Sequence, residues 1–253
     1  MDKNTIIGLV LIAAVLIGFS WYNTNQERNL QQIPTEQTAS APSNDNKPIA
    51  KQAIANTTID TTDIFYNAQK GQNTEVALQN NKVKIAIATK GGAISKVFLN
   101  EFKSYKDFEA KRNAPLLLYT AKDAGLDFML DTKEGTMAFS NYYFTPINKT
   151  DSTVTMQLLA KDGASIEIDY KLLPDNYLVN MSVRAKGMQK HLPSSTKAIQ
   201  MAWHDKVAQH EKGFYFENMY STLTYKRHDD DTQKLSEDET KEESITEDVD
   251  WIA

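Results

Sequence analysis

The chain of 253 residues contains no cysteine. This absence excludes disulfides, thiolate zinc sites, thiol nucleophiles and lipid attachment through an N-terminal cysteine. The chain also lacks an excess of basic residues, because 28 Lys and Arg stand against 33 Asp and Glu, giving a net charge of −5. Phosphate contacts require surplus positive charge, so nucleic acid is not expected as a partner.

The sequence also lacks the common motifs of nucleotide and metal binding. Gly91-Gly92 opens no helix and does not have the glycine spacing of a phosphate-binding loop. The run Asp229-Asp230-Asp231 has no glycine at the sixth position of a calcium loop, so we interpret it as solvated charge. No Ser-His-Asp arrangement surrounds a nucleophile turn. We therefore predict no cofactor.

The pattern closest to an enzyme site is AWHDKVAQHEKG, which contains His204-Asp205 and His210-Glu211. Two imidazoles and two carboxylates can bind a metal or share acid–base work. A spacing of six places the two histidines on opposite sides of a helix, however, and matches no known ligand spacing. We predict a solvated loop or sheet edge here, with no catalytic residue and no metal ligand.

What the chain does have is one long apolar run near its start, IIGLVLIAAVLIGF followed by SWY, at residues 6–22. A helix over this run rises roughly 26 Å, close to the hydrocarbon thickness of a bilayer. Trp21 and Tyr22 lie where such a helix leaves the membrane, a depth that amphipathic rings favour. After a flank of residues 1–5, we predict a transmembrane helix held in the lipid bilayer by Ile6, Ile7, Leu9, Val10, Leu11, Ile12, Val15, Leu16, Ile17, Phe19, Trp21 and Tyr22.

Two other interpretations of this run stay open. It can be a cleaved signal peptide, with Gly18 and Ser20 as the small residues before the cut, although bulky Trp21 and Tyr22 count against cleavage. It can also be a buried core helix, although a polar stretch follows directly. Lys3 lies before the predicted helix and Arg28 after it, so the positive charges on the two sides nearly balance and indicate the orientation only weakly. We predict a cytoplasmic N-terminus.

Residues 23–58 are rich in Gln, Asn, Thr, Ser and Ala and include Pro34, Pro42 and Pro48. They have no sustained hydrophobic period, so they cannot bury enough surface to offset the entropy of ordering. We predict a flexible tether between the membrane helix and a folded domain that spans residues 59–228.

Within that domain, apolar residues alternate with a period of two, as in strands with one buried face. Residues 83–88 and 94–99 flank Gly91-Gly92, where we predict a turn that needs positive φ and hence a hairpin. A clearer hairpin joins residues 154–158 to residues 166–172 through a turn at Asp162-Gly163, and residues 177–183 extend it to a meander. Weaker strand candidates are residues 116–119, 126–130, 136–145, 199–203, 213–216 and 222–226.

Short strands at intervals of roughly 10 to 12 residues, without crossover helices between them, predict a mainly β fold, an antiparallel sandwich. Residues 229–253 differ from this domain in charge. From Asp229 to Asp250 the net charge is −9, so the rest of the chain carries +4. We interpret residues 229–253 as an acidic linker and the start of a further element that begins with Trp251-Ile252-Ala253.

Several segments resemble the YidC family of bacterial membrane protein insertases, and most closely its Bacteroidetes-type members. The opening MDKNTIIGLVLIAAVLIGFS resembles the first transmembrane segment of that family. TKGGAISKVFLNEFKSY is similar to the Gly-Gly hairpin of its periplasmic domain, and DGASIEIDYKLLPDNYLVNMSV resembles another part of that domain. Asp250-Trp251-Ile252-Ala253 resembles the point at which these chains re-enter the membrane through an amphipathic helix.

The resemblance implies a periplasmic β-supersandwich, the galactose-mutarotase-like fold, held at the bacterial inner membrane by one helix. It implies a role in inserting and folding inner-membrane proteins, with nascent membrane proteins and the Sec translocon as partners. The likeness covers only the front half of the family's length, and the helices that do the insertion in that family are absent from this sequence. We therefore expect an anchor and interaction domain of an insertase, without catalytic chemistry.

Two alternatives remain. The mutarotase-like fold allows a membrane-anchored sugar-binding or mutarotase-like protein, and that hypothesis predicts that His204, His210 or a nearby Glu lines a concave pocket. A tethered sensor or scaffold domain fits the composition equally well.

Overall fold

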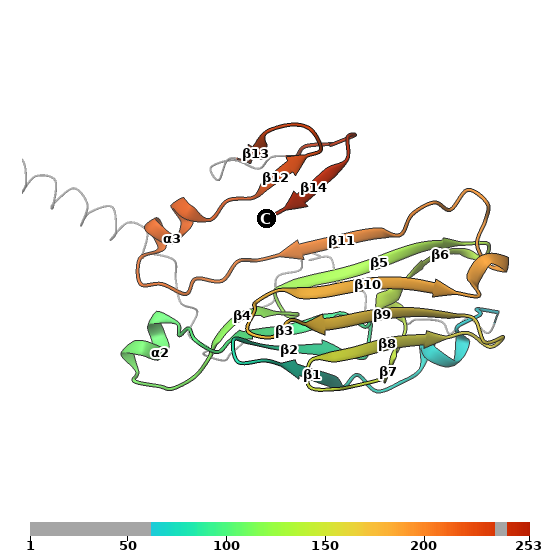
Figure 1. Cartoon of the computed structure of the whole chain (residues 1–253), viewed down its shortest axis with the longest axis horizontal. Helices are drawn as coiled ribbons and strands as arrows, with labels where there is room; N and C mark the ends of the chain where they lie inside the picture. The colour runs from blue at the N-terminus through green and yellow to red at the C-terminus, as the bar shows by residue number, and fades with distance from the viewer. Residues whose placement is uncertain (1–61, 236–241) are drawn as a thin grey trace, which may run out of the picture. The chain divides into compact units, whose positions relative to one another are not determined.

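The computed structural model describes residues 62–235 and 242–253 (Figure 1). The predicted flank, transmembrane helix and tether, residues 1–5, 6–22 and 23–58, lie outside the described residues, as do all the predicted membrane-anchoring side chains. Among the residues that are described, no helix has both the length and the apolar character needed to cross a bilayer.

Strands make up most of the regular structure, and every strand pair is antiparallel. Two sheets have four strands each, in the orders β1-β2-β3-β4 and β10-β9-β8-β7. Their strands are β1 (Glu75–Gln79), β2 (Val83–Ala88), β3 (Ile94–Leu99), β4 (Leu116–Thr120), β7 (Thr145–Ile147), β8 (Thr153–Leu159), β9 (Ser165–Leu172) and β10 (Val179–Lys186).

Two further sheets have three strands each, in the orders β11-β5-β6 and β13-β12-β14. Their strands are β5 (Ala124–Thr132), β6 (Gly135–Ala138), β11 (Gln200–Asp205), β12 (Thr224–Arg227), β13 (Thr232–Lys234) and β14 (Val249–Ile252). In the described part of the chain the helices are all short: the 3-10 turns η1 (Tyr66–Gln69), η2 (Phe139–Asn141) and η3 (Met188–Lys190), and the α-helices α2 (Tyr105–Glu109) and α3 (Phe214–Tyr220).

One hydrophobic core joins the first three sheets. Apolar side chains of β1 and β2, of β8 and β9, and of β5 and β6 meet in a single buried cluster, and Figure 1 shows the sheet of β7–β10 layered over that of β1–β4. β1 buries alternate residues, as the period of two requires. Each fully buried Leu, Ile or Phe contributes about 1.5–3 kcal/mol. The mainly β, antiparallel sandwich expected from the sequence is confirmed.

The Gly91-Gly92 segment joins β2 and β3, which pair as the expected hairpin. Both glycines have positive φ, 80° and 65°, a region that residues with a Cβ rarely adopt. The Tyr170 hydroxyl donates to the Gly92 carbonyl oxygen at 2.9 Å, and burial raises the pKa of this phenol. The turn is therefore fixed to the middle of β9 in the facing sheet.

The Asp162-Gly163 segment joins β8 and β9, and β10 extends this hairpin to the expected meander. Gly163 has φ 88°. The Asp162 carboxylate accepts from Ala164 N at 3.1 Å and interacts with Lys190 Nζ at 2.6 Å and His191 Nε2 at 2.7 Å. These contacts hold the pKa of the Asp162 carboxyl well below its usual range. The largest contribution comes from the Lys190 ammonium, followed by the Ala164 amide and His191. Through Lys190 and His191, the turn is therefore also joined to η3 and to the residue that follows it.

Two sequence predictions of strands are wrong in detail. Residues 136–145 do not form one strand, because η2 interrupts them and turns both Phe139 and Phe144 into the core. Asp127 stabilises this break, since its carboxylate accepts from Ser140 N at 3.0 Å and Ser140 Oγ at 2.5 Å. Residues 213–216 belong to α3, which begins at Phe214, and not to a strand. β1 was missed in the sequence although Val76 and Leu78 alternate with polar residues.

The C-terminal segment also differs from the expectation of an acidic linker from residue 229 and a new element at Trp251. β13 and β14 both pair with β12, so strands on either side of residues 236–241 belong to one sheet. Asp250 bridges Lys226 Nζ at 3.0 Å and His228 Nδ1 at 2.9 Å. Cross-strand pairing, which local charge does not reveal, therefore extends the folded part past the predicted boundary at residue 228.

Candidate functional site

The histidines that the sequence pointed to do not form a site. His204 and Asp205 lie in β11, and His210 and Glu211 lie in the loop that follows it. No hydrogen bond or ion pair joins their side chains. Within residues 62–235 and 242–253, no three His, Asp or Glu side chains gather as they would to hold a metal ion. His204 packs instead over Gly125 on β5, where an added Cβ would lie 2.4 Å from the His204 ring.

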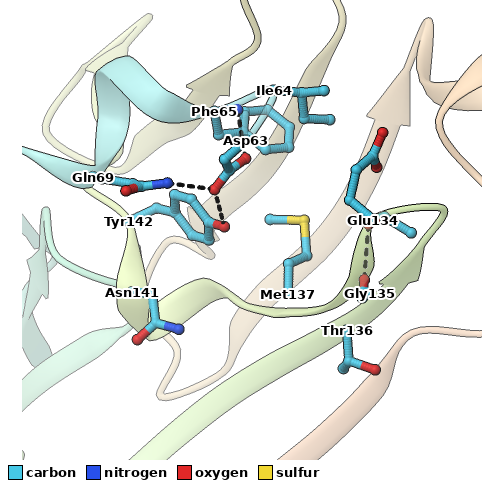
Figure 2. A pocket seen from close by; sticks show the side chains of 11 residues that line it. Asp63, Ile64, Phe65, Gln69, Glu134, Gly135, Thr136, Met137, Asn141 and Tyr142 are labelled. Atoms are coloured by element: carbon cyan, nitrogen blue, oxygen red, sulfur yellow. Dashed lines mark hydrogen bonds between the residues drawn. The ribbon is translucent and has the colours of Figure 1, made fainter. Parts of the chain in front are cut away.

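A cavity of about 230 Å³ lies where the first described residues meet the β5–β6 hairpin and η2 (Figure 2). It is lined by Asp63, Ile64, Phe65, Gln69, Thr132, Glu134, Gly135, Thr136, Met137, Asn141 and Tyr142. Neither His204 nor His210 is among these residues, so this cavity does not meet the expectation attached to the sugar-binding hypothesis.

The Asp63 carboxylate is the most heavily bonded group in this cavity. It accepts from Phe65 N at 2.8 Å, Gln69 Nε2 at 2.6 Å and Tyr142 Oη at 2.5 Å, all drawn in Figure 2. Phe65 itself is fully buried and packs edge-on against Tyr142. Because it accepts three hydrogen bonds within the chain, Asp63 joins the first described residues to η1 and to Tyr142, which follows η2.

The most unusual surface is a run of exposed apolar side chains from β11 to the start of β12, which we call the apolar strip. None of the residues of α3 is buried, and Phe216 and Tyr220 are 64% and 80% exposed. The strip consists of Met201, Trp203, Val207, Phe214, Tyr215, Phe216, Met219, Tyr220 and Leu223. Exposed apolar side chains in such number along one segment are typical of protein or membrane contact sites, since soluble surfaces rarely keep large apolar patches.

Hydrogen bonds to the Glu217 carboxylate hold α3 against the preceding loop, although the aromatic and Met side chains of the helix are exposed. The Glu217 carboxylate accepts from the backbone N–H groups of His210 at 2.8 Å and Glu211 at 3.2 Å. The His210 carbonyl oxygen in turn accepts from Tyr105 N of α2 at 2.7 Å. The loop before α3 is therefore closed onto the helix, and the helix presents its aromatic rings outward without burying any of them.

Sequence reasoning missed the apolar strip. It treated residues 213–216 as a strand and weighed only the histidines and carboxylates nearby. The signal was present in the segment FYFENMY, where aromatic and Met residues occupy five of seven positions and therefore cannot all face one core.

A second polar feature lies across β8, β9 and β10. Glu167 is only 4% exposed, and its carboxylate contacts Lys186 Nζ at 2.7 Å and Arg184 Nη2 at 3.2 Å. Arg184 also contacts Asp169 at 2.6 Å. The Lys186 ammonium above all, together with Gln157 and Arg184, lowers the pKa of Glu167 below its usual value. These pairs bind β10 to β9 on the outer face of the sheet.

The lowered pKa values of Glu167 and Asp162 predict a loss of stability in acid. A carboxyl whose pKa is lower in the folded than in the unfolded state contributes stability above its unfolded pKa, about 4. That contribution is lost as the pH falls through the folded-state pKa. We expect Glu167→Gln to cost about 1 kcal/mol at pH 7 and less at about pH 3, below the unfolded-state pKa, as measured by urea unfolding. Glu109→Gln, on the exposed surface of α2, is the control and should leave both values unchanged. A cost that stays constant with pH would contradict the ionic role of Glu167.

The comparisons with known proteins agree with the fold. Residues 75–253 match the family model of the YidC periplasmic domain. The chain is 38% identical over 260 residues to the membrane protein insertase YidC of Phocaeicola vulgatus, 36% identical to that of Bacteroides fragilis and 31% identical to that of Porphyromonas gingivalis. Each match covers the whole of this chain but only 41–42% of the relative. The chain therefore belongs to the YidC family, and residues 75–253 correspond to the periplasmic domain of that family.

Proposed function

We propose that this chain acts in the insertion and folding of bacterial inner-membrane proteins, as the anchored periplasmic part of an insertase. Its task is to bind hydrophobic segments of newly made membrane proteins outside the cytoplasm. Support comes from the name of the relatives, membrane protein insertase, and from the match to their periplasmic domain. The chain spans about two fifths of those relatives, so the activity of the whole protein enters only as part of this proposal.

The observation that carries the proposal is the apolar strip. Aromatic and Met side chains give large contact area and adapt to different apolar partners, as a site that receives many sequences requires. Trp203, Tyr215 and Tyr220 are exposed and have one polar atom each, which suits them to contact with a chain leaving the membrane interface. The role requires binding and release only, so no catalytic residue is needed.

The partners in this proposal are nascent membrane proteins and the lipid bilayer, which residues 6–22 would enter as a single helix with the main domain in the periplasm. Contact with the Sec translocon stays a prediction from the family resemblance. The sugar-binding alternative has no support from the cavity, whose lining omits both histidines, or from the names of the relatives.

The test is recovery of newly made membrane proteins on the full chain. The chain, solubilised with its membranes in mild detergent, is captured after a pulse of radiolabelled amino acids. We expect labelled inner-membrane proteins to be enriched over soluble proteins, and translocon subunits to accompany them if the Sec contact is present. Equal recovery of soluble and membrane proteins would refute the proposed docking function.

A further inference from the structure

The outer edge of β10 is open. β10 is the end strand of its sheet and pairs only with β9, over eight residues without a register shift. Among the described residues, no backbone hydrogen bond joins Val179–Lys186 to any segment other than β9. A row of backbone N–H and C=O groups therefore faces outward, which is the arrangement that accepts a further strand.

Most of the other sheet edges carry features that discourage strand addition, and β11, which pairs with β5 without a register shift, has only six residues. β7 has three residues and contains Pro146, which cannot donate a ladder hydrogen bond. The pairings that involve β4 and β14 contain register shifts, and β1, β6 and β13 have five residues or fewer. β10 is the longest edge strand in the described part of the chain, and no charged residue stands on its inner face to discourage pairing.

The inner face of β10 continues the apolar face of the core. The register places Val179, Met181 and Val183 beside Leu172, Tyr170 and Ile168 of β9, so all six side chains lie on one face. The three β9 residues are fully buried, whereas Met181 is 37% exposed and the two valines are half-buried. A strand added beyond β10 would cover this face if its own inward side chains were apolar.

The basic side chains on the outer face of β10 determine which charges an incoming strand should carry. Arg184 and Lys186 are 50% and 59% exposed, and their acidic partners Glu167 and Asp169 lie on the β9 side. A strand on the opposite side of β10 would have these two cations as its direct cross-strand neighbours, with the carboxylates one strand further away. Acidic residues on the outward face of the incoming strand are therefore favoured.

From this edge, its apolar inner face and its basic outer face, we infer that β10 binds an extended polypeptide segment, apolar on one face and acidic on the other, by adding it as a strand. The inference rests on the proposed function for the source of that polypeptide, a periplasmic segment of a newly made membrane protein. In this arrangement β10 binds extended segments, whereas the apolar strip binds hydrophobic segments at a separate place.

The experiment uses the full chain in mild detergent and a fluorescein-labelled ten-residue peptide of alternating valine and glutamate. We expect saturable binding by fluorescence anisotropy, and at least tenfold slower amide hydrogen exchange in β10 when the peptide is bound. A peptide with lysine in place of glutamate should bind at least tenfold more weakly. Methylating every second amide nitrogen gives two peptides, of which only the one whose free N–H groups face β10 should still bind.

Met181→Lys places a charge where the incoming strand needs an apolar contact, and we expect at least tenfold weaker binding. Ala185→Lys, which lies beyond Val183 on the same face, should do the same and serves if Met181→Lys fails to fold. Phe108→Lys on α2, at 69% exposure, is the matched control and should bind as the unaltered chain does. Failure of the unaltered chain to bind the glutamate peptide, together with intact recovery of membrane proteins in the capture test, would reject the β10 site and leave the proposed function standing.

Three further outcomes would overturn the inference. The first is slow hydrogen exchange in β10 before any peptide is added, which would mean that the edge is already covered. The second is equal binding of the glutamate and lysine peptides. The third is a dimer in sedimentation that Met181→Lys dissolves, which would assign the edge to a second copy of the chain.

Discussion

Replacing Tyr215 and Phe216 together by serine is expected to weaken binding of a hydrophobic segment at least tenfold. The two rings are 57% and 64% exposed, and they pack edge-on with their ring centroids 5.6 Å apart. They therefore present one continuous apolar surface. A tenfold loss corresponds to about 1.4 kcal/mol, and a single buried aromatic anchor often contributes more than that. The measurement is anisotropy of a labelled 20-residue peptide of leucine and alanine with terminal lysines.

The same double substitution should leave stability nearly unchanged, because neither ring is buried in the folded chain and exposed substitutions usually change stability by less than about 0.5 kcal/mol. The control is Phe102→Ser with Phe108→Ser, which removes two rings that are 50% and 69% exposed outside the apolar strip. An equal loss of peptide binding in both double variants would show that general hydrophobicity, and not the strip, accounts for the binding.

Gly92→Ala is expected to destabilise the domain by about 3 kcal/mol. Alanine at this position must adopt φ 65°, and its Cβ would lie 3.1 Å from Phe144 Cγ and 3.2 Å from Ile168 Cδ1. Both neighbours are core residues, so they cannot move without disturbing the packing. The backbone shift would also strain the hydrogen bond that Tyr170 donates to Gly92. Equilibrium unfolding in urea gives the free energy difference.

Gly163→Ala is the matched control for this prediction. Gly163 has a similar φ of 88°, but an added Cβ would meet nothing within 4 Å. Only the left-handed backbone penalty applies, so we expect a cost of about 1 kcal/mol. If the two variants lose equal stability, the packing of Gly92 against the facing sheet does not contribute, and the hairpin is held by its own turn alone.

Strands next to a clear glycine turn could be predicted from the sequence, because apolar residues recur along them and the turn marks where the hairpin reverses. Residues 94–99 and the meander that β8, β9 and β10 form are examples, since Gly91-Gly92 and Asp162-Gly163 mark their ends. Segment 136–145 failed for the opposite reason. Its apolar residues satisfy a strand pattern, but the contacts between Asp127 and Ser140, thirteen residues apart, break the strand. Such distant side-chain contacts leave no local signal.

The candidate site was less predictable than the fold. His204 and His210 stood out in the sequence because titratable residues are the usual candidates for chemistry. Among the described residues, however, the fold gathers no group of His, Asp and Glu around either of them that could hold a metal ion. The apolar strip was overlooked because apolar residues are expected inside. Whether Phe214 or Tyr220 is buried depends on which strands cover α3, and that is a property of the tertiary structure.

The most direct test of the central claim is site-specific photocross-linking in growing cells. A benzophenone amino acid is placed at Phe216 in the apolar strip or at Phe108 on α2, and the chain is illuminated during a pulse of radiolabelling. The proposed function predicts labelled adducts with newly made membrane proteins from position 216 and few from position 108. Adducts of equal yield at both positions, or none with membrane proteins at position 216, would contradict it.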